Sequence, residues 1–142
     1  MSERFKSIGN QILEIGVIIT DKDLIEIKEG SNIIIKSEDS VLSSMDPWCL
    51  NTHRRTGLYT QCLASETTLQ EAEQLVVEFL NRNFKNLSEH MLSLCGNSVY
   101  VDRQFLQVHM KHLGTFFGYR IIDVSSFKEI CCRRISLFTM PF

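Results

Sequence analysis

The chain has 142 residues and the composition of an ordinary globular protein, with 44% hydrophobic and 23% charged residues. Its formal net charge of −2 gives no overall basic character, so a nucleic-acid contact would need a local patch, which suits a short oligonucleotide better than a long duplex. The five cysteines are an odd number without a C-x-x-C pair, so they indicate neither a disulfide framework nor a zinc site and favour a reducing compartment. With no apolar run near the roughly 18 residues of a membrane span and no visible signal or presequence, we expect an intracellular protein, in the cytoplasm or the mitochondrion.

The first third of the chain predicts antiparallel strands. Residues 12–20 are rich in β-branched side chains and end at the polar turn Asp21-Lys22-Asp23. Residues 24–27 and 32–36 continue as strands, with a bulge or bend at Gly30, so we expect an antiparallel meander. Residues 38–45 predict a short helix, which stops at Asp46-Pro47 because the residue before a proline avoids helical angles.

The second half predicts alternating helices and strands. Residues 68–84 form the clearest helix, since Thr68 and Glu71 make a capping box ahead of an apolar helical repeat. A strand over 91–95, a helix from about 101 to 113 ended by Gly114, a strand over 119–124 and a helix capped by Ser126 and Glu129 follow. This order implies parallel pairing with right-handed crossovers. We therefore predict one α/β domain over residues 1–142 with a mixed sheet.

Polar side chains follow two of the predicted strands. Ligands of open α/β sheets lie beyond the carboxyl ends of strands, where hydroxyls and helix N-terminal amides suit phosphate oxygens. Gly96-Asn97-Ser98 and then Asp102 follow the first strand, and Asp123-Val124-Ser125 follows the second. Arg120 could bind a phosphate with two hydrogen bonds, and Asp102 could hold a divalent cation of the kind used in phosphoryl transfer.

Each of these residues also has a purely structural interpretation. The helix dipole alone favours an acidic residue such as Asp102 in a first turn, and Ser125 could serve only as an N-cap. Trp48 and His53 form an aromatic-polar pair on a predicted loop, followed by two arginines, and either ring could stack on a base. The alternative is that Trp48 fills the core and His53 lies on the surface.

The chain resembles the oligoribonucleases, small 3'-to-5' exoribonucleases of the DEDD superfamily that degrade very short RNAs. The matching segments are "ILEIGVIITDKDLIEIKEGSNIIIK", "SMDPWCLNTHRRTGL", "CGNSVYVDRQFL" and "YRIIDVSSFKEICCRR", in the family's order and spacing. The sequences of these segments are more similar to those of the eukaryotic members than to those of the bacterial ones. The resemblance implies a ribonuclease H-like fold, a homodimer, and hydrolysis with two divalent cations, Mg²⁺ or Mn²⁺.

The resemblance also implies roles for seven residues. Asp102 matches an acidic metal ligand of the second exonuclease motif, and Trp48 and His53 match residues that line the base pocket. Ser98, Arg120 and Ser125 match the cluster that caps the terminal phosphate and gives the preference for dinucleotides. Tyr119 matches a tyrosine that reaches into the partner subunit's site.

Both ends of the chain depart from the family's pattern. Ahead of Gln11 the family has a strand bearing Asp-x-Glu and a leucine wedge, where this chain has "MSERFKSIGNQ". After Arg134 the family has a helix bearing His and, five residues later, Asp, where this chain has "ISLFTMPF". Residues 1–10 and 135–142 are thus divergent, and we expect a truncated domain without the first central strand and the last helix.

The departures bear on activity. Two-metal catalysis needs several carboxylates to hold the cations, and removal of a proton from water needs a positioned base. Of the four metal-binding carboxylates that the resemblance implies, only Asp102 is present, and the family's general-base histidine is missing. We expect a chain that is catalytically impaired on its own. The alternatives are a non-catalytic module that binds short RNA or pairs with a full-length subunit, and an α/β domain that shares only ancestry with the family.

Overall fold

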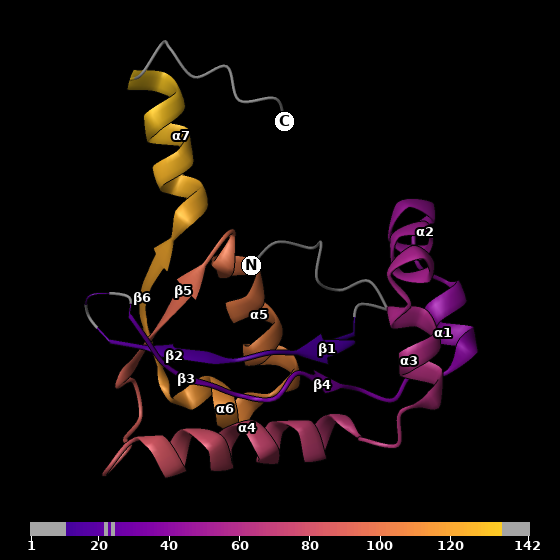
Figure 1. Ribbon diagram of the computed structural model, residues 1–142, viewed down its shortest axis with the longest axis horizontal. Coiled ribbons are helices and arrows are strands. Elements are labelled where there is room, and N and C mark those ends of the chain that lie inside the picture. Colours follow the sequence, from indigo (N-terminus) through magenta and orange to yellow (C-terminus); the bar gives the residue numbers. More distant parts are fainter. Residues whose placement is uncertain (1–10, 22, 24, 135–142) are drawn as a thin grey trace. The chain divides into compact units, whose positions relative to one another are not determined.

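A computed structural model describes residues 11–134 except 22 and 24 (Figure 1). The divergent ends, residues 1–10 and 135–142, lie outside the described residues, as does the predicted loss of a strand and a helix there. The chain divides into two compact units, with the boundary between Lys85 and Asn86. Each unit is described by itself below.

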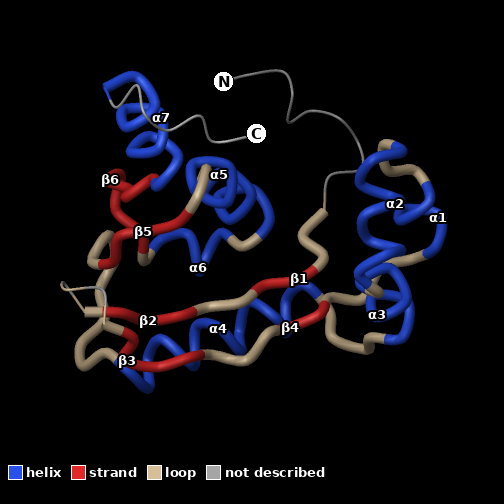
Figure 2. The backbone as a smooth tube through the Cα atoms, turned by 45° about the horizontal axis from the view of Figure 1, so that its top comes forward, coloured by secondary structure: helices blue, strands red, loops and turns tan. Residues whose placement is uncertain are grey.

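The first unit begins with one long antiparallel hairpin, whose four strands are the red segments labelled β1 to β4 in Figure 2. The segments next to the turn pair as β2 with β3, and the segments farther from it pair as β1 with β4. The expected antiparallel pairing is confirmed, but the chain forms a hairpin of two arms and not a three-stranded meander. Asp21 makes the predicted polar turn, since its Oδ1 accepts hydrogen bonds from the backbone of Asp23 and Ile25. The bounds are β1 Glu14–Ile15, β2 Ile18–Thr20, β3 Glu26–Glu29 and β4 Ile33–Ile34.

Gly30 marks the break that the sequence predicts between the two halves of the second arm. Its N–H donates to the carbonyl of Val17 at 2.8 Å. A Cβ at this position would lie 3.0 Å from that carbonyl oxygen and 3.2 Å from the ring of Phe79. Only glycine lets the hairpin approach the helix that carries Phe79 so closely.

Four helices complete the first unit. The predicted short helix and the predicted capping box are confirmed, because Thr68 Oγ1 accepts from the N–H of Glu71 and the Glu71 carboxylate accepts from the N–H of Thr68. A helix that the sequence does not predict begins directly at Pro47. The bounds are α1 Asp39–Ser43, α2 Pro47–Thr56, α3 Leu58–Ala64 and α4 Leu69–Asn83.

A small apolar core holds α1 and α3 together. Leu42 and Cys62 are completely buried, and they cluster with Leu58 and Tyr59. The Tyr59 hydroxyl donates to the carboxylate of Asp39 at 2.7 Å, so the buried ring keeps a partner for its polar end. Leu13 and Ile34 pack on the same cluster, which anchors the hairpin to the helices.

The second unit is built on a parallel strand pair, as the sequence predicts. β5 (Leu92–Gly96) and β6 (Phe117–Asp123) are joined by α5 (Val99–His109) and α6 (Lys111–Thr115), and α7 (Val124–Arg134) follows. The predicted single helix ending at Gly114 is wrong. Met110 leaves the helical angles at φ −130° and is completely buried, and the chain then forms α6, which contains Gly114.

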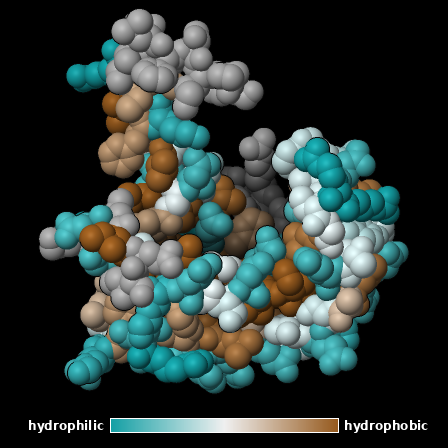
Figure 3. All heavy atoms as spheres, viewed as in Figure 1, coloured by the Kyte–Doolittle hydropathy of each residue, from teal (hydrophilic) through white to brown (hydrophobic). Residues whose placement is uncertain are grey.

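The last described helix, α7, extends from the end of β6 (Figure 1). None of its described residues is buried, and its exposed apolar side chains, brown and tan in Figure 3, include Val124, Phe127 and Ile130. The predicted cap at Ser126 is wrong, because the helix starts at Val124 and Ser126 lies inside its first turn. Strands and helices together make a mixed α/β structure of the predicted class, with three two-stranded sheets among the described residues.

Candidate functional site

The carboxyl ends of β5 and β6 lie side by side in the second unit. Gly96, the last residue of β5, pairs with Asp123, the last residue of β6. One carboxylate oxygen, Asp123 Oδ1, accepts from the N–H of Ser98 at 2.8 Å, from the N–H of Ser125 at 2.9 Å and from the Ser125 hydroxyl at 2.6 Å. The structure therefore brings Ser98 and Ser125 together, as we expect for side chains at the end of a parallel pair.

These hydrogen bonds favour the ionised form of Asp123. The bond from the Ser125 hydroxyl is the largest of the effects that lower the pKa of this carboxyl below its ordinary value, and the backbone N–H groups of Ser125, Ser98 and Tyr100 act in the same direction. Partial burial opposes them. Asp123 is therefore held in its ionised form, and its Oδ1 oxygen is already engaged by internal hydrogen bonds.

Ser98 has an unusual backbone at the start of α5. Its φ of 56° lies in the left-handed region, which few residues other than glycine, asparagine and aspartate adopt. Its side chain makes no capping hydrogen bond, so its hydroxyl is available within the part of the chain that the structure describes. Ser125 differs, because its single hydroxyl proton is donated to Asp123 and its oxygen is left to accept.

Tyr119 and Arg120 lie in an irregular part of β6. Leu92 pairs with Phe117 and Leu94 with Ile121, so three residues of β6 face only one residue of β5. In a regular strand two neighbouring side chains would point to opposite faces, but here both are exposed and the Arg120 guanidinium lies 4.6 Å from the centre of the Tyr119 ring. Bulges of this kind redirect side chains near functional sites.

Two further contacts hold this irregular segment. Arg103 Nη1 on α5 donates to the Tyr119 carbonyl at 2.6 Å. A Cβ on Gly118 would lie 3.1 Å from the carbonyl oxygen of His90, so the glycine permits a close backbone approach. Arg120 itself makes no ion pair with the described residues, which leaves its guanidinium N–H groups available to a ligand.

Asp102 is exposed in the first turn of α5, four residues after Ser98 and therefore on the same side of the helix start. No hydrogen bond or ion pair joins its carboxylate to another of the described residues. The same part of the chain contains no group of three or more His, Cys, Asp or Glu side chains that could hold a metal ion. Asp102 alone does not supply the donors that a two-cation centre requires, so the described residues do not fit such a centre by themselves.

Trp48 and His53 lie in the first unit, on α2 and not on the predicted loop. Asp46 explains the error: its carboxylate accepts from the N–H groups of Trp48 at 3.0 Å and Cys49 at 3.1 Å, and Pro47 occupies the first helical position, which suits proline. The two rings do not form a pair, because five residues along a helix turn their directions apart by about 140°. Trp48 is 74% exposed, so it does not fill the core.

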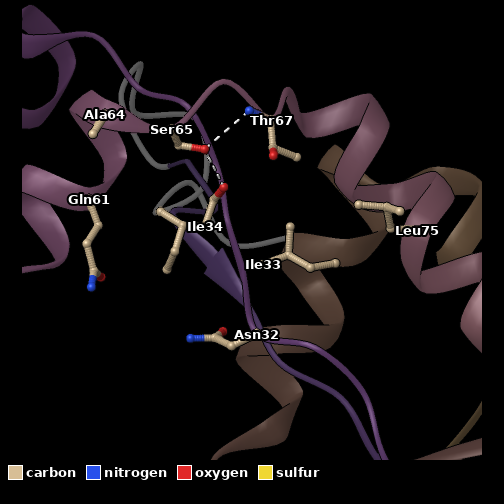
Figure 4. A pocket seen from close by; sticks show the side chains of 8 residues that line it. All are labelled: Asn32, Ile33, Ile34, Gln61, Ala64, Ser65, Thr67 and Leu75. Atoms are coloured by element: carbon tan, nitrogen blue, oxygen red, sulfur yellow. Dashed lines mark hydrogen bonds between the residues drawn. The ribbon is translucent and has the colours of Figure 1, made fainter.

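Two of the open hollows formed by the described residues bear on the site. One, in the first unit, is lined by eight uncharged residues of β4, α3 and neighbouring segments, with Ser65 hydrogen-bonded to Ile34 and Thr67 (Figure 4). Without a titratable side chain it offers no acid-base chemistry. The other, of about 420 Å³ in the second unit, is lined by Tyr100, Ile121, Ile122, Asp123, Ser126 and Phe127.

The sequence predicts most of the polar residues at the strand ends, Asp123 among them, but it misses the roles of Asp123 and Arg103, which arrange the others. Asp123 directly precedes α7 and takes the capping role that the sequence assigns to Ser126 or Ser125. An acidic residue between a strand and a helix is a signal for this role. Nothing in the sequence indicates that Arg103 contacts the Tyr119 carbonyl.

Comparison with known proteins decides the family. Residues 4–137 match the exonuclease family RNase_T. The chain belongs to the exonuclease family. It is 43% identical over 124 residues to the mitochondrial oligoribonuclease of Mus musculus, 42% identical over 124 residues to that of Homo sapiens, and 36% identical over 125 residues to the oligoribonuclease of Thiobacillus denitrificans.

These matches cover 87%, 87% and 88% of this chain. The chain spans 51% of the length of each mammalian relative and 67% of the bacterial one. The sequence identity is higher to the two mammalian proteins than to the bacterial protein, in agreement with the similarity of the motifs to those of eukaryotic members. The match confirms the resemblance to the oligoribonucleases and places the chain in a family of 3'-to-5' exoribonucleases.

Proposed function

We propose that this chain serves in 3'-to-5' degradation of short oligoribonucleotides and dinucleotides, with its described residues supplying recognition of the RNA. The observation that carries the proposal is the convergence of Ser98, Asp123 and Ser125 where β5 and β6 end, in a chain that is 36% to 43% identical to named oligoribonucleases. Arg120 and the Ser98 hydroxyl are free to donate to a terminal phosphate. Trp48 presents an exposed ring on which a base stacks.

The metal-dependent step is a separate part of the proposal. A divalent cation, Mg²⁺ or Mn²⁺, would neutralise charge that develops on the phosphate, and Asp102 is the residue we assign to it. One exposed carboxylate holds a cation weakly and does not fix two of them. We infer that these 142 residues hydrolyse RNA slowly at best when no other chain is present.

A second candidate function is a non-catalytic role, as a short-RNA-binding module or as the partner of a full-length subunit in a dimer. The favouring observation is that the residues assigned to RNA binding lie among the described ones, whereas no group of three or more His, Cys, Asp or Glu side chains in that part of the chain could hold a metal ion. The names of the relatives, some of them mitochondrial, support an intracellular location. Among the described residues no helix is long and apolar enough to cross a membrane.

The hydrolysis test uses the purified chain, a labelled diribonucleotide and Mn²⁺, with Asp102→Ala as the reference. We expect mononucleotide release no greater than that of the variant. Release clearly above the variant would show that the chain is an enzyme by itself and would remove the second candidate. Co-purification with a longer oligoribonuclease subunit would identify the dimer role.

A further inference from the structure

We propose that Asp123 is a positioning residue, which sets the phosphate-binding groups that follow β5 and β6 without contacting the phosphate. The inference rests on the proposed function and deepens it. It assigns a role to a side chain that the strand-end pattern includes but to which neither that pattern nor the resemblance gives a function.

A single oxygen of Asp123 connects the two strand-to-helix junctions. Asp123 Oδ1 accepts three hydrogen bonds, one from the N–H of Ser98 and two from Ser125. Ser98 and Asp123 are 25 residues apart and belong to different strand-to-helix junctions. The carboxylate therefore fixes the start of α5 relative to the start of α7, in addition to the pairing of Gly96 with Asp123.

Ser98 has a strained backbone that depends on Asp123. A serine at φ 56° persists only where its surroundings hold it, and its N–H is held by Asp123 at 2.8 Å. The backbone angles of Ser98 determine where its Cβ and hydroxyl point. Asp123 thus controls the direction of a hydroxyl that itself has no capping partner.

The two serines have different roles in this arrangement. Because the Ser125 hydroxyl donates its only proton to Asp123, it does not also donate to a phosphate while this bond is present. The donors to a terminal phosphate are then the Ser98 hydroxyl and the Arg120 guanidinium. Ser125 acts with Asp123 as part of the support.

The test measures the dissociation constants of the full chain for a 5'-phosphorylated diribonucleotide and for the same diribonucleotide without the phosphate. The ratio of the two constants reports phosphate recognition and is insensitive to a general loss of folded protein. Asp123→Ala removes the accepting oxygen, whereas Asp123→Asn keeps an oxygen at the same place. Thr68→Ala is the matched control, because it removes the N-cap of α4 and lies outside the proposed site.

We expect Asp123→Ala to reduce the phosphate preference at least tenfold, with Asp123→Asn staying within about threefold of the wild type and Thr68→Ala unchanged. The amide signal of Ser98 in NMR spectra should shift in Asp123→Ala and much less in Asp123→Asn. An Asp123→Ala chain that keeps the preference overturns the inference alone, and so does an Asp123→Asn chain as impaired as Asp123→Ala. A wild-type chain with no preference for the phosphate overturns the proposed function as well.

Discussion

The carboxylate of Asp123 accepts a hydrogen bond of 2.8 Å from the backbone nitrogen of Ser98. This bond joins the two places where the chain passes from a parallel strand into a helix. It also explains how the backbone of Ser98, a residue that the family resemblance links to RNA binding, is stabilised at φ 56°. Asp123 is thus occupied by internal hydrogen bonds, which fits the role of a positioning residue that we propose for it.

The first prediction concerns acid stability. The pKa of Asp123 is lowered on folding, so its stabilising contribution is complete above the ordinary value of 3.8 and is lost as the pH falls through the lower, folded value. Asp46 and Glu71, whose pKa values are also lowered, act in the same direction. We expect the urea midpoint to fall as the pH drops below about 4, and Asp123→Asn to make that fall shallower. An equally steep fall in the variant would contradict the assignment.

A second prediction concerns the exposed ring on α2. Trp48→Ala should weaken diribonucleotide binding by about 1–3 kcal/mol, roughly 5- to 150-fold, because stacking on one base is lost. The free energy of unfolding should change by less than about 0.5 kcal/mol, since the side chain is 74% exposed. Trp48→Phe, which keeps a ring, should retain most of the affinity in the same titration. Unchanged binding in Trp48→Ala would show that this ring takes no part in RNA binding.

The irregular part of β6 gives a third prediction. Arg103→Met keeps the length of the side chain but removes the donor to the Tyr119 carbonyl. The backbone amides of Tyr119 and Arg120 should then exchange with solvent faster, and binding of a 5'-phosphorylated diribonucleotide should weaken several-fold. Arg82→Met, on the exposed face of α4, is the control and should leave both quantities as they are. Unaltered amide exchange in Arg103→Met would show that the bulge does not need this contact.

The core of the first unit gives a fourth prediction. Leu42 is completely buried beside Leu58, Tyr59 and Cys62, so Leu42→Ala should lower the free energy of unfolding by about 2–5 kcal/mol. Leu63→Ala, a change of the same size at a side chain that is 44% exposed, should cost much less. Denaturant unfolding of both variants measures the difference. Equal losses would mean that the cluster does not anchor α1 and α3.

Patterns within one segment allow the sequence to predict much of this fold. The Thr68 and Glu71 capping box is confirmed. The alternation of strands and helices after residue 91 is confirmed too, apart from the break at Met110 that separates α6 from α5. Asp46-Pro47 predicts only the end of the preceding helix, so the sequence does not predict the start of α2. The same two residues also begin a helix, with the proline at its first position and the aspartate as its cap.

Features that depend on the register of long-range strand pairing could not be predicted. The exposure of both Tyr119 and Arg120 follows from a register shift against β5, and no local pattern encodes that shift. The role of Asp123 requires Gly96 to lie opposite it, which places Ser98 within reach of its carboxylate. The sequence identifies the serines of the site, but the residues that hold them emerge only when the strands are paired.

The most direct test of the account is a titration of the chain with a 5'-phosphorylated diribonucleotide, in parallel for the wild type and Arg120→Ala. The free guanidinium of Arg120 should contribute a charged hydrogen bond of about 1.5–3 kcal/mol, so the variant should bind roughly 10- to 150-fold more weakly. Arg82→Ala, an exposed arginine outside the proposed site, should bind as the wild type does. Saturable binding by the wild type with this loss in Arg120→Ala is the predicted result. Absence of binding by the wild type, or equal binding by Arg120→Ala, would contradict the proposal that this chain recognises short RNA ends.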